Sequence, residues 1–459
     1  CVSLKNIDLP VNLTTISSYA FKNCISIQKF VFREKLSSFG YYAFQNCSGL
    51  IEISIPESLK TIPRYLFVSC FSLVNLNLSS IVNINTNSFA HCTSLQNITF
   101  SEKLTSIGSN AFYNCTSIQN LNLPSSLSTI QTGAFALCTS LINIELPSSL
   151  KVIGDFAFNG TGIQSIKFTN ITEIGSGAFS NCFALREIDF PDSLTKIGSK
   201  AFTNCSSLSG ELILPYNLKS IGSYSFQNCS NLKKVTFPNK LITLDIYCFS
   251  RCSNLEGTLD LSYITFIAGN SFEYCTKISN VIFNDTVEKI GLSAFRYCEN
   301  LQSLTLPKEL TTINGYSFCC CYKLKDIKFS EKLQKIDSNA FWNCTSLTKL
   351  AFNSDLLIGN RCFQNCYNIK DVNLNRVTEI GNYSFCNCSS LSSLSFGNNI
   401  QKIGDFAFWN CTGIKTIIIP EELTSDKFGN GVFYNCSGLS GSAPIPEHFT
   451  FVPNQFLYG

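Results

Sequence analysis

The 459-residue chain carries 34 lysine and arginine residues against 31 aspartate and glutamate residues, and it contains no methionine. Nucleic-acid binding requires a concentrated basic surface that displaces phosphate counterions. The near balance of charge, without any run of like charges, therefore argues against nucleic acid as a partner. No stretch approaches the roughly 20 unbroken apolar residues of a membrane span. Membrane attachment would thus require segments outside this chain.

The organising feature of the sequence is a phenylalanine that returns about every 23 residues. Such a period is typical of a repeat architecture and overrides the several domains that length alone suggests. A cysteine follows three residues after most of these phenylalanines. The spine phenylalanines are Phe21, Phe44, Phe67, Phe89, Phe112, Phe135, Phe158, Phe179, Phe202, Phe226, Phe249, Phe272, Phe295, Phe318, Phe341, Phe363, Phe385, Phe408, Phe433 and Phe456.

One repeat unit, Leu104 to Ser126, reads LTSIGSNAFYNCTSIQNLNLPSS. After the ladder cysteine, apolar and polar residues alternate, which predicts a strand with one buried face. A proline then removes a backbone donor and ends the pairing. A second apolar pair follows, and we expect Gly108 to permit a bend before Phe112 points inward. A single unit cannot bury its apolar side, so stacked coils must close the core and give each strand a parallel neighbour.

The repeat predicts a solenoid of about 20 coils of roughly 23 residues, with a parallel β-sheet on the concave face and little regular α-helix. After Phe158 the segment Asn159 to Gly162 is one residue short and lacks the ladder cysteine. Three units gain a glycine before the strand, at Gly210, Gly257 and Gly441, and an extra glycine in a strand register indicates a bulge.

The ends of the chain carry no polar capping element. Cys1 opens in the middle of a unit, and Gly459 occupies the next ladder position. Arrays of this kind need caps that cover their terminal core. We therefore expect one leucine-rich-repeat domain over residues 1–459, a fragment that lacks its native end caps and continues in at least one direction.

The consensus L-x-x-I-x-I-P-x-x-L-x-x-I-G-x-x-A-F-x-x-C resembles the BspA-like, or treponemal-type, class of leucine-rich repeats along the entire chain. That class occurs in surface antigens of bacteria and in large families of parasitic protists. The resemblance implies a cell-surface or extracellular adhesin or antigen that binds host-cell or matrix macromolecules. It implies no particular binding residue, because the consensus residues are the buried ones.

The 24 cysteines include 19 at the single ladder position. Parallel side chains in adjacent coils rarely reach the torsion of a disulfide, so we interpret the ladder as buried free thiols that pack as small apolar groups. Cys319, Cys320 and Cys321 form a triplet without a matching pair in a neighbouring unit. A zinc site would need such a pair or a nearby histidine, and the chain holds only His91 and His448. We expect no metal.

The sequence offers no catalytic constellation. Neither histidine recurs near a nucleophile in an adjacent repeat, so a triad has no general base. Glu187, Asp189 and Glu211 should face outward from adjacent strands, where they form either a cation or acid-pair site or a solvated acidic spot flanked by lysines. We favour the second interpretation, and we expect neither enzymatic activity nor a cofactor.

The outward strand positions are the best candidates for binding. Stacked amides offer both donors and acceptors, which suits polar partners such as glycans or peptide backbones. The same residues also fit an amide ladder that only stabilises the sheet. A rival function is an intracellular protein-interaction scaffold in the cytoplasm, which reduced cysteines would favour. The candidate residues are Asn75, Asn77, Asn97, Thr99, Asn120, Asn122, Asn143 and Glu145.

Overall fold

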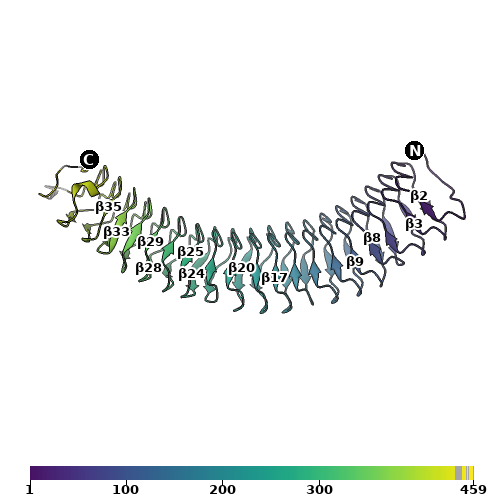
Figure 1. Ribbon diagram of the computed structural model, residues 1–459, viewed down its shortest axis with the longest axis horizontal. Coiled ribbons are helices and arrows are strands. Elements are labelled where there is room, and N and C mark those ends of the chain that lie inside the picture. The colour runs from purple at the N-terminus through teal and green to yellow at the C-terminus, as the bar shows by residue number, and fades with distance from the viewer. Residues whose placement is uncertain (440–446, 451, 453, 458–459) are drawn as a thin grey trace. The chain divides into compact units, whose positions relative to one another are not determined.

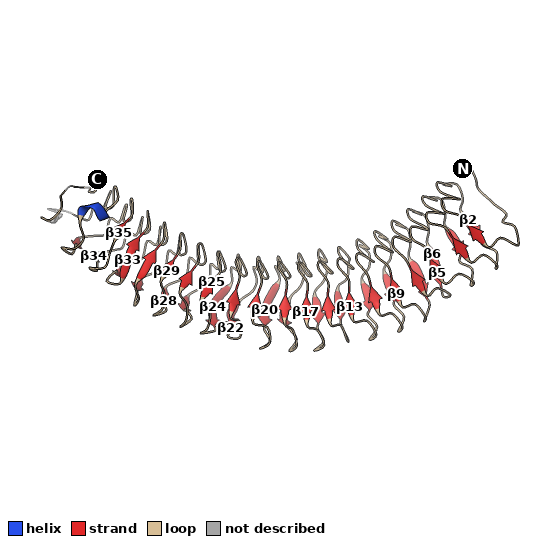
Figure 2. Ribbon diagram, viewed as in Figure 1, coloured by secondary structure: helices blue, strands red, loops and turns tan. Residues whose placement is uncertain are grey.

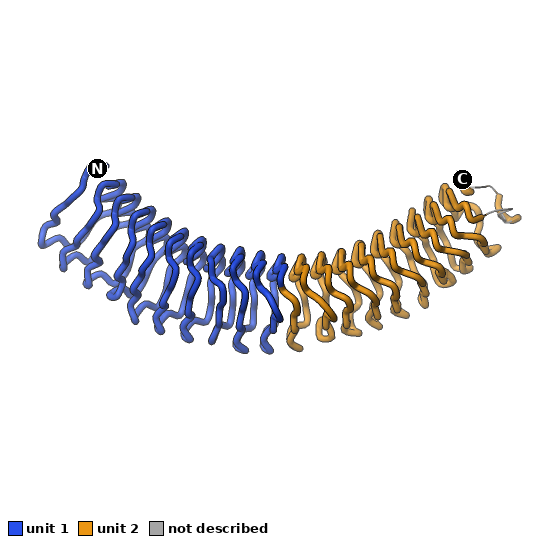
Figure 3. The backbone as a smooth tube through the Cα atoms, turned by 180° about the vertical axis from the view of Figure 1, so that it is seen from behind, with its two compact units in different colours: residues 1–231 blue, residues 232–459 orange. Residues whose placement is uncertain are grey.

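The computed structural model describes residues 1–439, 447–450, 452 and 454–457. These residues contain 36 short β-strands and one 3-10 helix, η1 (Ser425–Lys427), but no α-helix (Figure 2). The chain divides into two compact units, Cys1–Asn231 and Leu232–Gly459 (Figure 3). The single domain expected over residues 1–459 stays a prediction.

Each regular coil contains two strands. The even-numbered strand carries the alternating pattern: in β4 (Glu52–Ser54) Ile53 is buried between the exposed Glu52 and Ser54. The odd-numbered strand is mostly two residues long and usually ends in a buried apolar side chain, as β5 (Thr61–Ile62) does. Local alternation therefore decides which side chains enter the core.

The remaining strands of the first unit alternate between the two series along the chain. They are β1 (Thr15–Ile16), β2 (Lys29–Val31), β3 (Ser38–Phe39), β6 (Asn75–Leu78), β7 (Asn83–Ile84), β8 (Asn97–Phe100), β9 (Ser106–Ile107), β10 (Asn120–Asn122), β11 (Thr129–Ile130), β12 (Asn143–Glu145), β13 (Val152–Ile153), β14 (Ser165–Lys167), β15 (Glu173–Ile174), β16 (Glu187–Asp189), β17 (Lys196–Ile197), β18 (Gly210–Ile213) and β19 (Ser220–Ile221).

The strands of the second unit continue the same alternation. They are β20 (Leu232–Thr236), β21 (Thr243–Leu244), β22 (Gly257–Leu261), β23 (Phe266–Ile267), β24 (Ile278–Phe283), β25 (Lys289–Ile290), β26 (Ser303–Thr305), β27 (Thr312–Ile313), β28 (Asp326–Lys328), β29 (Lys335–Ile336), β30 (Lys349–Ala351), β31 (Leu356–Ile358), β32 (Asp371–Asn373), β33 (Val377–Ile380), β34 (Ser393–Ser395), β35 (Lys402–Ile403) and β36 (Thr416–Ile418).

The two series pair differently. The odd strands β5 to β19 form an unbroken eight-stranded parallel sheet in the first unit, and β21 to β35 form another in the second (Figure 1). The even strands form shorter groups, β2-β4-β6-β8, β10-β12 and β14-β16 in the first unit. In the second unit they pair as β22-β24, β26-β28, β30-β32 and β34-β36. The prediction of stacked parallel strands is confirmed, and the even series is interrupted at intervals.

The spine phenylalanines stack in the core, as predicted. Phe112 is fully buried, and its ring centroid lies 5.3 Å from that of Phe89 and 5.4 Å from that of Phe135, with nearly parallel planes. Gly108 has another role than the predicted bend. A Cβ there would come within 2.7 Å of the backbone of Ile84 and Asn85 in the preceding coil. Glycine is required because adjacent coils approach so closely.

The ladder cysteines point into the core, which confirms their predicted packing. The Cys115 and Cys138 thiols donate hydrogen bonds to the carbonyl oxygens of Phe89 and Phe112, both at 3.2 Å. Burial raises the pKa of Cys138 to about 12. Cys1, by contrast, is exposed. After Phe158 the missing cysteine is replaced by the buried Thr161, whose hydroxyl donates to the Phe158 carbonyl at 2.9 Å.

The expected number of strands needs revision, and one of the expected bulges is confirmed. The series of outward-facing even strands contains 18 members among the described residues, whereas we expected 20. The first expected segment, near Ile7, is exposed and forms no strand, and the last, after Cys436, falls largely outside the described residues. The expected bulge at Gly257 is present: the register between β22 and β24 shifts between Gly257 and Thr258. Gly210 and Gly257 both adopt positive φ angles, +74° and +77°, which favour glycine. Gly441 lies outside the described residues.

Candidate recognition surface

The eight candidate residues lie on four successive even strands of the first unit, β6, β8, β10 and β12, and all eight are exposed. We call them the amide stripe. Asn75 pairs in register with Asn97, and Asn77 with Thr99. On the next pair of strands, Asn120 aligns with Asn143 and Asn122 with Glu145. The structure therefore brings the predicted residues together on one face.

Two hydrogen bonds join side chains of the amide stripe across coils. The Asn97 Nδ2 donates to the Asn75 Oδ1 at 2.8 Å, and the Asn143 Nδ2 donates to the Asn120 Oδ1 at 3.0 Å. In both, the later coil donates to the earlier one. The ladder interpretation thus holds for these two pairs, but no such bond links Asn97 to Asn120 among the residues that the structure describes.

A groove of about 400 Å³ lies between β8 and β10, where the even series is interrupted. Uncharged polar side chains line it, with one isoleucine among them. The lining residues are Gln96, Asn97, Ile98, Thr99, Gln119, Asn120 and Asn122. The groove combines donors and acceptors without a formal charge.

The two glutamines of this groove were not predicted from the sequence. Gln96 and Gln119 each directly precede an even strand, at the same position of successive repeats, and both are exposed. Their signal was available, because the residue before an outward strand position also borders the same face. Strand alternation predicts only every second residue of a strand to face outward, so it did not indicate Gln96 and Gln119, which precede their strands.

A second amide ladder was also missed. It occupies the position two residues after the spine phenylalanine, where the backbone has positive φ, a conformation that Asn tolerates better than most residues. Each later Asn donates its Nδ2 to the Oδ1 of the preceding one at 2.7–2.9 Å. The longest run is Asn343, Asn365, Asn387, Asn410 and Asn435. These side chains are internally satisfied and form a structural ladder.

The acidic group is better explained as solvated surface. Glu187 and Asp189 lie on β16, Glu211 lies on β18, and all three are exposed. The Asp189 carboxylate forms an ion pair with Lys167 at 3.7 Å. Within the described part of the chain, no cluster of three or more His, Cys, Asp or Glu side chains is arranged to hold a metal ion.

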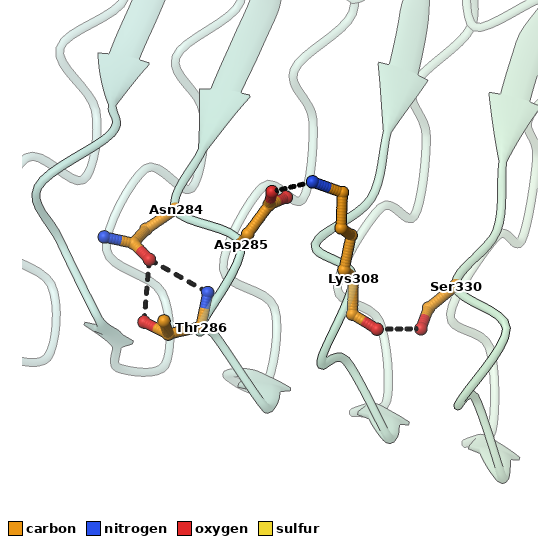
Figure 4. Close-up of polar contacts among 5 residues, drawn as sticks. All are labelled: Asn284, Asp285, Thr286, Lys308 and Ser330. Carbon is orange, nitrogen blue, oxygen red and sulfur yellow. Dashed lines mark hydrogen bonds and ion pairs between the residues drawn. The ribbon is translucent and has the colours of Figure 1, made fainter.

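Charged side chains of neighbouring coils pair with each other elsewhere too. In the turns that follow β24 and β26, the Lys308 ammonium contacts the Asp285 carboxylate at 2.5 Å (Figure 4). Beside this pair, the Oδ1 of Asn284 accepts hydrogen bonds from the backbone N–H and hydroxyl of Thr286, and the Lys308 carbonyl accepts one from Ser330. These groups satisfy one another, unlike the groups that face the groove.

The cysteine triplet lies in the core of the second unit. Cys319 and Cys321 are fully buried, and Cys320 is 1% exposed. The Cys319 thiol lies 3.4 Å from the Cys320 sulfur, and this hydrogen bond lowers the pKa of Cys320 to about 6. A thiol buried to this degree is closed to a macromolecular or dissolved substrate. The triplet therefore offers no exposed nucleophile.

Both histidines contact polar groups that are not nucleophiles. A ring nitrogen of His91 lies 3.1 Å from the Asn114 amide nitrogen. The His448 Nε2 lies 3.1 Å from the Leu423 carbonyl oxygen. Neither contact resembles the base and nucleophile of a hydrolytic triad.

Exposed apolar residues are scattered over the outward positions. Ile213, Ile282 and Ile418 are exposed, on β18, β24 and β36. Trp409 is 38% exposed, whereas Trp342 is half-buried. Among the described residues, no helix has the length and apolar character needed to span a bilayer.

The short parallel strands, the stacked spine phenylalanines and the buried thiol ladder define a leucine-rich-repeat solenoid with an outward polar strand face. The family model for the BspA type leucine rich repeat region matches residues 1–89, 60–186, 172–264, 265–375 and 357–459. The chain therefore belongs to the BspA type leucine-rich-repeat family, as the sequence resemblance indicated.

The chain is similar to solved structures of other leucine-rich-repeat proteins. A leucine-rich repeat protein from Bacteroides ovatus is 26% identical, with a TM-score of 0.50 over 80% of this chain and 85% of that chain. A leucine rich cell surface protein from Faecalibacterium prausnitzii is 23% identical, with a TM-score of 0.39 over 73% of this chain and 82% of that one. The pneumococcal vaccine antigen PcpA is 18% identical, with a TM-score of 0.40 over 83% and 88%. No curated protein matches the chain significantly.

Proposed function

We propose that this chain is a non-enzymatic recognition protein of the cell surface, an adhesin or antigen that binds a protein or glycan of host cells or matrix through the amide stripe. The observation that carries the proposal is the exposure of all eight stripe residues on four successive strands around a polar groove. Membership of the BspA type family supports a binding role.

The groups available on the stripe suit recognition of a neutral polar partner. The Oδ1 of the exposed Asn77 accepts from the backbone N–H of Ser79 at 3.1 Å, and its Nδ2 has no partner among the described residues. Thr99 and Asn122 have no side-chain partner among the described residues and remain available to a ligand. Each polar contact contributes about 0.5 to 1.5 kcal/mol. Several contacts over several coils are therefore needed for useful affinity.

The test replaces four stripe residues, Asn77, Asn97, Asn120 and Asn122, with lysine. The bulky charged side chains should weaken attachment to host cells or matrix at least tenfold, about 1.4 kcal/mol. The variant should fold, because these side chains face solvent and the change removes only the two cross-coil amide bonds and the bond from the Ser79 N–H to Asn77.

A matched control carries four lysines on exposed outward positions of the second unit, at Ser303, Thr305, Ser393 and Ser395. It adds the same charge and should attach like the parent chain. Equal attachment by the stripe variant and the parent would refute the role of the stripe. Equal loss in both variants would show that added charge alone explains the effect.

One observation favours a second candidate function, an intracellular protein-interaction scaffold. All 24 cysteines are free thiols, and 23 of them are buried, a pattern that suits a reducing compartment. Antibody labelling of intact and permeabilised native cells separates the two functions. Labelling only after permeabilisation would favour the scaffold, and labelling of intact cells the surface protein.

A further inference from the structure

The amide stripe contains a ladder with one missing rung. In both observed rungs the Nδ2 of the later coil donates to the Oδ1 of the earlier coil. The amide ladder from Asn343 to Asn435, which we call the turn ladder, repeats this direction in every rung. The same rule would have Asn120 donate to Asn97, but within the described residues that bond is not made.

The missing rung coincides with a break between strands. β8 ends one group of paired even strands and β10 begins the next, so the two neighbours are not joined by a strand ladder. The Asn97 Nδ2 already donates to Asn75, and the Asn120 Oδ1 already accepts from Asn143. The groove is therefore bordered by an open acceptor, the Asn97 Oδ1, and an open donor, the Asn120 Nδ2.

A hydroxyl group fits this arrangement because one oxygen both donates and accepts. It donates to the Asn97 Oδ1 and accepts from the Asn120 Nδ2, which completes the ladder. A ligand hydroxyl that forms both bonds displaces solvent from the gap without losing hydrogen bonds. A peptide group divides donor and acceptor between two atoms and fits the single gap less well.

The surroundings select for a neutral ligand. The seven lining residues include two asparagines beside the gap, two glutamines, Thr99 and Asn122, and none is charged. The exposed carboxylate of Glu145 lies in register with Asn122 and disfavours an acidic sugar. A groove of about 400 Å³ lies at the small end of the roughly 300 to 1,000 Å³ typical of small-ligand sites.

We propose that the groove between β8 and β10 binds a short segment of a neutral saccharide, one hydroxyl of which bridges Asn97 and Asn120. This assignment rests on the proposed recognition function and names its ligand class. The flanking Gln96, Gln119, Thr99 and Asn122 contact neighbouring hydroxyls of the sugar.

The experiment titrates the full chain with neutral gluco-, galacto- and manno-configured tetrasaccharides, and with sialylated and sulfated tetrasaccharides for comparison. Binding is measured by saturation-transfer NMR and calorimetry. Asn120→Asp replaces the open donor with an oxygen while keeping the acceptor that Asn143 uses. It should weaken binding of a neutral tetrasaccharide at least tenfold.

The matched control is Asn373→Asp, which makes the same change at an exposed outward position of β32. The Asn373 Oδ1 accepts from the Asn375 backbone N–H, a bond that aspartate keeps, so this variant should bind like the parent. Gln119→Ala serves as a second groove variant. It removes a lining side chain that bonds no other described residue, and it should also weaken binding.

Selective binding of a neutral tetrasaccharide, lost in both groove variants and kept in the control, supports the assignment. Binding of charged saccharides only, or unchanged binding by Asn120→Asp and Gln119→Ala, overturns it. If no tetrasaccharide binds while the parent chain still attaches to cells through the stripe, the ligand class is wrong and the recognition function stands. If neither binding nor attachment occurs, both proposals fall.

Discussion

The stacked phenylalanine spine predicts a large and local loss of stability in Phe202→Ala. Phe202 is fully buried, and its ring centroid lies 5.4 Å from that of Phe179 and 5.2 Å from that of Phe226, with nearly parallel planes. A third ring, Phe190, meets it edge-on at 5.7 Å. Removing a buried phenylalanine costs about 3 to 5 kcal/mol. Three lost aromatic pairs, each contributing about 0.5 to 1.5 kcal/mol, place the expected cost near the upper end.

Differential scanning calorimetry of the full chain tests this prediction. Each coil contacts only its neighbours, so the array need not melt in one step. If the 231 residues of the first unit melt together, a loss near 5 kcal/mol lowers their transition by about 10 to 20 °C. The second unit should keep its transition.

The matched control is Phe183→Ala, in the same unit. Phe183 is 58% exposed, so its removal should change stability by no more than about 0.5 kcal/mol. The reasoning fails if Phe202→Ala and Phe183→Ala give the same melting profile. In that case the stacking of the spine would contribute nothing beyond an exposed ring.

Two further predictions concern thiols and glycines. At pH 8 a thiol reagent should modify the exposed Cys1 but not the ladder cysteines of the folded protein. Burial raises the pKa of Cys92 and Cys138 to about 12, so almost none of their thiol is ionised at pH 8. Denatured, non-reduced protein should show most of the 24 cysteines free, and a majority found in disulfides would contradict the prediction. Gly257 has a positive φ with open space around it, whereas a Cβ on Gly108 would meet backbone atoms at 2.7 Å. Asparagine should therefore be tolerated better than alanine at Gly257 but less well than alanine at Gly108. The same order of melting temperatures for the two substitutions at both sites would refute the distinction.

The sequence predicted the buried half of this fold well. Burial repeats with the period, so the inward direction of Phe112 and the buried position of Cys115 followed from spacing alone. The outward direction of the amide stripe followed from the same alternation, because every second strand residue faces away from the core. Gly108 was placed correctly but for the wrong reason, since close approach between coils involves residues 23 positions away.

The groove was beyond sequence reasoning. Whether β8 pairs with β10 depends on the distance between two whole coils, and they do not pair. Nothing in residues 97–100 or 120–122 differs in kind from neighbouring strands that do pair. Because the strands do not pair there, Asn97 keeps an open acceptor and Asn120 keeps an open donor. The turn ladder through Asn410 had a visible cue, an asparagine repeated two residues after the spine phenylalanine, but its positive φ did not.

Repetition itself indicates where specificity can arise in such a chain. A residue copied into every coil serves the fold, and its polar groups are satisfied by the copies on either side, as in the turn ladder. A ligand needs groups that the copies leave open, so an interruption of the even series is the natural place to find them. At each of the other interruptions, at least one flanking strand has no amide at its outward positions. In β14, β18, β26, β30 and β34 these positions hold serine, threonine, alanine, isoleucine, lysine or glutamate, and in β20 they hold lysine and threonine. Only between β8 and β10, within the described residues, do amides face an interruption from both sides. The break there leaves a donor opposite an acceptor, and this asymmetry distinguishes a binding site from one more rung of a structural ladder.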